Sequence, residues 1–400
     1  NNSPTNEDEN IHPDENYARE VMQLFTIGIH QLEMDGSIVT DEDGVPIPTY
    51  ESNDVGELAK VFTGLGPAQY WSPWVDYSEE TVEWGAWFNT VPFINSTLPM
   101  VMFEGWHEEG VKHLLNGAST VDGASGGQDI DMALDLLFEH SNTPPFVSKL
   151  LIQRMVKSNP SPEYIERVAS VFVNNGEGVR GDLSAVVKAI LLDEEARHCS
   201  WIEDVSSGKM REPMMRYMQL LKSFNASNQS GKMWSVGWMA QEMGQHPMAA
   251  PTVFNFFLPT YAPSGPISDS SLVAPEFELL NSANSIKYIN LIADMCLGGT
   301  YMESITMVHP DDIGIPWWGV GINSPEDNVT LDFEDEIILA SNDVQAMVDR
   351  LNILLAGGTA SSETLDIIST LIDVEGIAPA DRVKLALYLL LISPDYIIQK

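Results

Sequence analysis

The sequence predicts a mainly α-helical fold: a compact multi-helix domain with a small β-hairpin and two long irregular insertions. Apolar residues recur at helical spacing along most of the chain, and proline and glycine stand where helices would begin and end. Two stretches, one rich in aromatic and one in acidic residues, lack this period. We therefore expect one helical domain over residues 1–400, with insertions at 65–128 and 300–336.

The N-terminal part is predicted to hold two helices and the hairpin. Apolar residues spaced i, i+4, i+7, i+8 and i+11 predict a helix over residues 17–28. The hairpin is expected over 38–49, turning at Asp43-Gly44. A second helix is expected over 53–63, where Gly64 is placed to stop it.

The rest of the chain has the pattern of a series of helices. Each segment carries apolar residues at helical spacing, and residues such as the Gly357-Gly358 pair mark the ends. The predicted helices are 130–140, 144–157, 161–176, 182–197, 212–224, 233–243, 278–297, 343–356, 362–372 and 380–391.

The insertion at 65–128 concentrates aromatic residues among Gly, Pro, Asn and Ser. Short strands are expected near 91–94 and 100–103. The rings have two interpretations, a stacking surface for a ligand or an apolar plug inside a loop-rich subdomain, and the sequence does not separate them. The candidate binding-surface residues are Trp71, Trp74, Trp84, Trp87 and Trp106.

The charge balance restricts the partners of this protein. Among 400 residues, 20 Lys+Arg stand against 58 Asp+Glu, a net charge of −38. Nucleic acid is excluded as a partner because its binding needs Lys and Arg to displace counterions. No apolar run approaches the roughly 20 residues of a membrane span. Such acidity is typical of a protein that stays soluble in salty or extracellular water.

Four residues are candidate catalytic groups. Glu15 and Arg19 have the i, i+4 spacing of an ion pair on one helix face, and the alternative is an ordinary solvated face. His107 and Lys112 bound the densest cluster of titratable residues, where a His beside carboxylates is a candidate general base or metal ligand. The alternative there is a turn at Gly110, held by side-chain hydrogen bonds.

The candidate metal ligands are His107, Glu108, Asp41 and Asp43. No cofactor is certain from the sequence, and a divalent metal such as calcium is the candidate. The acidic fragments do not complete the spacing of an EF-hand, so an irregular site is what remains. Asp311-Asp312 and the acidic run at 334–336 are further candidates for such a site, and the favoured interpretation of both is solvated charge.

Two cysteines, Cys199 and Cys296, allow one disulfide at most. A bond between them is compatible with export, but their helical contexts favour two buried thiols.

Several motifs together resemble the domain of unknown function 1800 family, in its marine, long-loop form. The segment from His107 to Lys112 is similar to the family's His-Asp-x-Gly-x-Lys, with Glu108 where Asp is usual. The other segments include Glu15-Asn16-Tyr17-Ala18-Arg19-Glu20, Leu151-Ile152-Gln153-Arg154-Met155-Val156, Lys209-Met210-Arg211-Glu212-Pro213, Ala250-Pro251-Thr252-Val253-Phe254-Asn255-Phe256 and Ser393-Pro394-Asp395-Tyr396.

The resemblance implies a largely helical, exported protein, secreted or periplasmic, whose N-terminal family portion is absent from this chain. Such proteins are often encoded beside members of the domain of unknown function 1501 family, which makes one of these the expected partner; a homo-oligomer is the alternative. No catalytic mechanism comes with the resemblance, so whether the chain is an enzyme stays open.

Two functions are therefore expected. The first is an exported helical scaffold or binding protein that works in a complex with a co-exported partner, on the aromatic and acidic loops. The second is a metal-assisted hydrolase acting on an extracellular polymer or ester. Its site would be lined by His107, Glu108 and Lys112, with Glu15 and Arg19 from the first helix.

Overall fold

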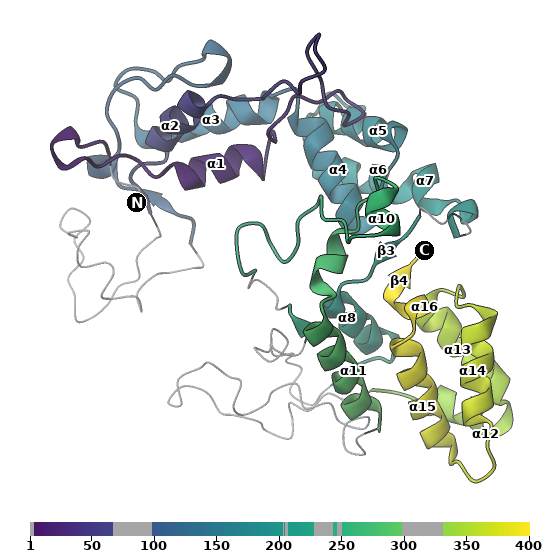
Figure 1. Ribbon diagram of the computed structural model, residues 1–400. Coiled ribbons are helices and arrows are strands. Elements are labelled where there is room, and N and C mark those ends of the chain that lie inside the picture. Colours follow the sequence, from purple (N-terminus) through teal and green to yellow (C-terminus); the bar gives the residue numbers. More distant parts are fainter. Residues whose placement is uncertain are drawn as a thin grey trace, which may run out of the picture. The chain divides into compact units, whose positions relative to one another are not determined.

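The computed structural model confirms the mainly α-helical fold (Figure 1). It describes residues 4–66, 98–202, 204, 207–227, 243–245, 250–297 and 331–400. The chain divides into two compact units, unit 1 comprising 1–149 and 162–189 and unit 2 comprising 150–161 and 190–400. The predicted single domain over 1–400, with insertions at 65–128 and 300–336, stays a prediction.

Helices α1 and α2 pack together in the first core of unit 1. Asp14 begins α1 by accepting the backbone N–H of Asn16 at 2.9 Å, and Ala18 and Met22 are fully buried. The elements from this part of the chain are η1 (Glu7–Glu9), α1 (Glu15–Gln23), α2 (Ser52–Val61), η4 (Glu104–Trp106), η5 (Leu115–Gly117), α3 (Gly126–Glu139), α4 (Thr143–Met155), α5 (Pro162–Val173) and α6 (Leu183–Leu192).

Helix α1 ends earlier than the predicted range of 17–28. The hydroxyl of Thr26 donates to the carbonyl oxygen of Val21 at 2.7 Å, and Gly28 has φ +71°. These two features end the helix. Apolar residues keep their helical spacing beyond that point, which is why the predicted range was too long.

The predicted hairpin is present as a set of isolated antiparallel bridges, including Thr40 with Pro46. Asp41 donates its N–H to the carbonyl oxygen of Val45 at 2.9 Å, and its carboxylate accepts the N–H groups of Asp43 and Val45. The expected turn at Asp43-Gly44 is confirmed, with Gly44 at φ +79°.

Unit 2 is built around a core of helices from the C-terminal third of the chain. Met347, Leu355, Ile372 and Leu387 are all fully buried there. The elements are α7 (Glu194–Arg197), η6 (Cys199–Ile202), β3 (Lys209–Met210), α8 (Pro213–Ser223), α10 (Pro266–Asp269), η7 (Pro275–Leu279), α11 (Ser282–Leu297), α12 (Glu334–Asn342), α13 (Val344–Ala356), α14 (Ser362–Ile372), α15 (Pro379–Leu391), α16 (Pro394–Ile397) and β4 (Ile398–Gln399).

Two features of unit 2 differ from the sequence predictions. The helix expected over 182–197 is broken at Asp193, whose carboxylate accepts the N–H of Glu195 and starts α7. Helix α12 was not predicted, and the interpretation of 334–336 as solvated charge was wrong for Glu336, which is 2% exposed. Its Oε1 accepts Arg350 Nε at 2.6 Å, a partner that helical periodicity does not reveal.

Some predicted elements lie outside the described residues. These are the strand near 91–94 and, apart from its last residue, the helix over 233–243. The other expected strand is β2 (Val101–Met102), which pairs antiparallel with β1 (Leu65–Gly66) in the register Leu65 to Met102. A second two-stranded antiparallel sheet joins β3 to β4. These two sheets are the only ones within the residues that the structure describes.

Gly64 links the end of α2 to the segment that follows β2. It has φ +77°, and its carbonyl oxygen accepts the N–H of Phe103 at 2.9 Å. A Cβ placed on Gly64 would lie 2.7 Å from the Phe103 carbonyl oxygen and 3.0 Å from the His107 nitrogen. Only glycine therefore fits both the backbone conformation and the close approach of residues 103–107.

We expect Gly64→Ala to destabilise unit 1 by about 3 kcal/mol, through a left-handed backbone penalty plus a backbone clash. Gly44→Ala is the matched control, because Gly44 has the same sign of φ but no atom within 4 Å of an added Cβ. It should cost only about 1–2 kcal/mol. Denaturant unfolding of the two variants measures the difference, and equal losses would show that the close approach is unimportant.

The two cysteines are free thiols in different environments. Cys296 is buried, as expected, whereas Cys199 is exposed, so the expectation of two buried thiols was wrong for Cys199. Burial raises the pKa of the Cys296 thiol to about 12. Because the thiolate is the reactive form, Cys296 should be almost inert in the folded chain near neutral pH.

A maleimide reagent should therefore label Cys199 in the native chain and Cys296 only after unfolding. Counting labels by mass spectrometry, with Cys199→Ser as the control, checks this. Native labelling of Cys199→Ser at the rate of an unfolded chain would contradict the burial of Cys296.

Candidate functional site

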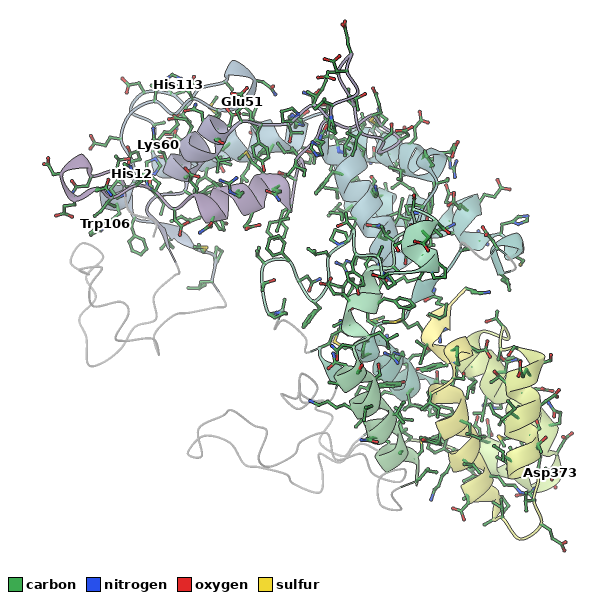
Figure 2. The ribbon with its side chains drawn as sticks, in the orientation of Figure 1. His12, Glu51, Lys60, Trp106, His113 and Asp373 are labelled. Carbon is green, nitrogen blue, oxygen red and sulfur yellow. The ribbon has the colours of Figure 1, made fainter. Side chains whose placement is uncertain are left out.

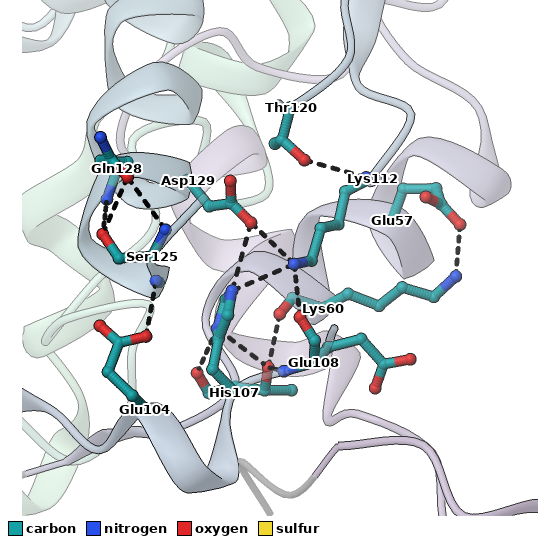
Figure 3. A network of polar contacts seen from close by, with 12 residues as sticks. Glu57, Lys60, Glu104, His107, Glu108, Lys112, Thr120, Ser125, Gln128 and Asp129 are labelled. Carbon is teal, nitrogen blue, oxygen red and sulfur yellow. Dashed lines mark hydrogen bonds and ion pairs between the residues drawn. The ribbon is translucent and has the colours of Figure 1, made fainter. Parts of the chain in front are cut away.

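A buried polar network in unit 1 contains two of the candidate catalytic residues. The turn of η4 ends at His107, and the loop that follows carries Lys112. Helix α3 supplies Asp129, one residue beyond a capping box in which Ser125 and Gln128 bond each other's backbone N–H groups. Local turn and cap geometry thus brings three titratable side chains together (Figure 3).

Lys112 lies at the centre of this network. Its Nζ is 2.7 Å from Asp129 Oδ2 and 3.1 Å from His107 Nε2, and it also donates to the carbonyl oxygen of Glu108 (Figure 3). Lys112 and Asp129 are each only 2% exposed. The three hydrogens of the ammonium group therefore have three acceptors, which is the condition for burying such a charge.

The orientation of the His107 ring is fixed from its other side. Its Nδ1 lies 3.0 Å from the carbonyl oxygen of Thr63, which can only accept, so Nδ1 carries a hydrogen. In the neutral ring Nε2 is then an acceptor and points at Lys112 and at Asp129 Oδ2, which is 3.2 Å away. Imidazole, amine and carboxylate thus meet at one point.

Two threonines hold the backbone around the network. The Thr63 hydroxyl donates to the carbonyl oxygen of Lys60 at 2.6 Å and accepts the N–H of Glu108 at 2.7 Å. The Thr120 hydroxyl accepts the N–H of Lys112 at 3.0 Å. These bonds tie the end of α2 and the loop after η5 to the segment that carries the network.

Glu57 on α2 makes a further tie to the same loop. Its carboxylate accepts Lys60 Nζ at 2.6 Å (Figure 3). It also accepts the N–H of His113 at 2.8 Å. Partial burial raises the pKa of Glu57, but the hydrogen bonds from Lys60 and His113 outweigh it and hold the pKa below its ordinary value. The carboxylate is therefore ionised at neutral pH and keeps both bonds.

Glu15 and Arg19 form the predicted ion pair on α1, with Arg19 Nη2 3.2 Å from Glu15 Oε2. Their side chains are 52% and 41% exposed, whereas those of His107 and Lys112 are 5% and 2% exposed. Within the described part of the chain, no hydrogen bond or ion pair joins the Glu15–Arg19 pair to the buried network. The four candidate catalytic residues thus fall into one surface pair and one interior pair.

The candidate metal ligands are also separated. Glu108 directs its carboxylate to the N–H of Thr5, and Asp41 uses its carboxylate within the hairpin turn beside Asp43. His107 belongs to the buried network. Among the residues that the structure describes, no group of three or more His, Cys, Asp or Glu is arranged to hold a metal ion.

Trp106 is the one candidate binding-surface residue that the structure describes (Figure 2). It is 38% exposed and borders a surface hollow of about 430 Å³ that Pro4, Thr5 and Ile11 also line. Trp71, Trp74, Trp84 and Trp87 lie outside the described residues.

Asp129, Thr63 and Thr120 are parts of the network that sequence reasoning missed. Asp129 stands near the start of a helix, where a carboxylate is ordinarily explained by the helix dipole. It is separated from Lys112 by 17 positions. Only the loop that folds between them brings them together, and no local pattern marks that loop.

Unit 2 has a comparable buried contact, between Lys209 on β3 and Glu276 in η7. Lys209 Nζ also donates to the carbonyl oxygen of Gln153 at 3.0 Å, and the side chains of Lys209 and Glu276 are 8% and 1% exposed. It resembles the Lys112–Asp129 contact in burial but has no imidazole among its bonded partners within the described residues.

Comparison with known proteins gives one match. The model of the family described as "Protein of unknown function (DUF1800)" matches residues 2–398. Neither the curated proteins nor the solved structures contain a match to this chain. Within the described residues, no helix is both long enough and apolar enough to span a membrane.

We expect Lys112→Met to destabilise unit 1 by about 3–5 kcal/mol, because it leaves the Asp129 carboxylate buried without its cation. Arg19→Met is the matched control: it removes the cation of an exposed ion pair in the same unit and should cost under about 1 kcal/mol. Urea unfolding followed by circular dichroism measures both. Equal small losses would mean that Lys112 and Asp129 are not buried together.

Proposed function

We propose that this chain, which belongs to the DUF1800 family of proteins of unknown function, is an exported helical scaffold or binding protein that acts in a complex with a co-exported partner protein. Export, to the periplasm or the outside of the cell, is part of the proposal and is supported by the acidity of the chain.

The observation that carries the proposal is an apolar stripe on α14 and the short segment that follows it. We define the α14 stripe as Ile367, Leu371 and Val374, which are 51%, 48% and 48% exposed. Ile367 and Leu371 are four residues apart and lie on one face of α14, and Val374 follows two residues after the helix ends, while Ile368 and Ile372 pack another face of α14 into the core. Apolar side chains aligned outward on a packed helix are suited to contact another protein.

The charges beside the α14 stripe indicate the chemistry of the partner. Glu363, Asp366 and Asp373 border it, and Figure 2 labels Asp373 directly after α14. Two copies of this chain would bring like charges together at such a contact, at a net charge of −38 each. We therefore favour a different protein, with an apolar patch bordered by Lys and Arg, over a homo-oligomer. A member of the domain of unknown function 1501 family is our candidate for this partner.

The buried network supports a structural role for His107 and Lys112. Every acceptor that Lys112 Nζ reaches belongs to the protein itself, and His107 is bonded through both ring nitrogens. These bonds make the loop and α3 one rigid piece, as a scaffold requires.

The metal-assisted hydrolase stays the alternative proposal. The Thr63 carbonyl oxygen holds His107 Nδ1 and leaves Nε2 with the free electron pair of an oriented general base, which is the observation in its favour. It requires a substrate to reach a side chain that is 5% exposed. His107→Ala tested against a panel of ester and polysaccharide substrates, with and without added divalent metal, separates the two proposals. Loss of a hydrolytic activity in that variant would favour the hydrolase.

We expect an affinity-tagged chain to recover a second protein from native extract, and the variant Ile367→Asp, Leu371→Asp, Val374→Asp to lose it. Three carboxylates in the α14 stripe would be desolvated in the interface, which costs more than the contact gains. Because acidic residues border the stripe, recovery should also weaken as salt is raised.

Val121→Asp is the control, since Val121 is an exposed apolar residue of unit 1, at 69%, that lies outside the stripe. It should leave recovery unchanged, and circular dichroism should show all variants folded. Recovery of monomer alone from native extract, at low salt, would contradict the proposal, and equal recovery with the triple variant would contradict the assigned surface.

A further inference from the structure

We propose that Lys112 and Asp129 join in an intramolecular amide bond, which makes a covalent cross-link between the loop after η4 and helix α3. The inference rests on the buried placement of amine, carboxylate and imidazole at one point. It does not depend on the proposed function, because a scaffold and a hydrolase could both carry such a link.

The two reacting groups are already held together. Lys112 Nζ lies 2.7 Å from Asp129 Oδ2, and both side chains are 2% exposed. Backbone bonds fix both ends, through Thr120 to the Lys112 nitrogen and through the capping box before Asp129. Such fixed proximity raises the effective concentration of an amine toward a carboxyl group by many orders of magnitude.

His107 is placed to move the protons of the reaction. Its Nε2 is 3.1 Å from Lys112 Nζ and 3.2 Å from Asp129 Oδ2, so one nitrogen reaches both the group that loses a proton and the oxygen that gains one. Thr63 holds the opposite ring nitrogen through its carbonyl oxygen at 3.0 Å. His107 is thus a general base toward the amine and then a general acid toward the departing oxygen.

The step balances without any further reactant. His107 Nε2 takes a proton from Nζ of Lys112, and the free electron pair of Nζ forms a bond to Cγ of Asp129. The Cγ–Oδ2 bond then breaks, and Oδ2 leaves as water with two hydrogens that came from Nζ. An ammonium and a carboxylate become one amide and one water, with no change in net charge and no oxidation or reduction.

The surroundings favour the product. Burial makes an ammonium–carboxylate pair costly, and the amide removes both charges. Asp129 Oδ1, which has no hydrogen-bond partner within the described residues, becomes the amide oxygen and no longer carries ionic charge. The remaining N–H can donate to the Glu108 carbonyl oxygen that Nζ already contacts. A site that excludes water also resists hydrolysis back to the acid.

The Lys209–Glu276 contact of unit 2 is an internal comparison. It is also buried, and Glu276 Oε2 likewise has no partner within the described residues. Its amine contacts Glu276 and the Gln153 carbonyl oxygen, with no imidazole to relay a proton. We therefore expect it to remain an ion pair in the same molecule.

Mass spectrometry of the purified, fully denatured chain tests the proposal. The intact mass should be lower by one water. Trypsin should cleave after Lys209 but not after Lys112, so that residues 61–149 stay in one peptide that is lighter by one water. Adding a protease that cleaves before Asp should release a branched peptide in which a segment ending at residue 121 is joined to the segment carrying Asp129.

Two variants assign the roles. Lys112→Arg keeps a cation but has no amine nucleophile, so it should show the full mass. His107→Gln should form the link about 100-fold more slowly than the natural chain, measured as the linked fraction against time after refolding. If this variant does not refold, the natural chain alone decides the proposal.

A natural chain with the full mass and cleavage after Lys112 would overturn the amide bond. Equal rates in the natural chain and His107→Gln, or a link also at Lys209 and Glu276, would overturn the relay through His107.

Discussion

The contact between Lys112 and Asp129 is the interaction on which this region of unit 1 depends. Neither charge could be buried at 2% exposure without the other, so the loop and α3 must fold together. Once Lys112 Nζ lies against Asp129, its remaining hydrogens reach His107 and the Glu108 carbonyl oxygen. The bonds of Thr63 then transmit this arrangement to the end of α2. A single buried ion pair thereby sets the position of three segments that are far apart in sequence.

The helices could be predicted from the sequence because their signals are local. Asp14 before α1, Gly64 after α2 and Gly357 after α13 act within one helical turn, and each is found where its residue type implies. Two errors were local, at Thr26 beyond the end of α1 and at the Asp193 cap, but the missed helix α12 depends on a more distant partner. Helix α12 begins with three acidic residues that look solvated, and it is held by Arg350 from the next helix. Short-range patterns do not contain that contact.

In the candidate site too, the residues close in sequence were found and the distant one was missed. His107 and Lys112 stood out because they lie close in sequence within a dense set of titratable groups. Asp129 did not, because it resembles an ordinary charge in the first turns of a helix. The sequence also placed Glu15 and Arg19 beside His107 in one hypothetical site, although their exposure differs greatly from that of Lys112. Residue types indicate candidate site residues, but the burial of each side chain in the fold determines which candidates lie together.

The few basic residues of this chain include partners of its buried carboxylates. The chain has only 20 Lys and Arg, and Lys112, Lys209 and Arg350 are bonded to the buried carboxylates Asp129, Glu276 and Glu336. Each of these pairs uses one cation and one carboxylate, so pairing leaves the net charge of −38 to the other residues. The interior contacts are therefore balanced in charge, and the excess of acidic residues belongs to the rest of the chain. In the proposed complex, a partner with Lys and Arg at the contact would meet this acidic excess, whereas a second copy of the chain would add like charge to it.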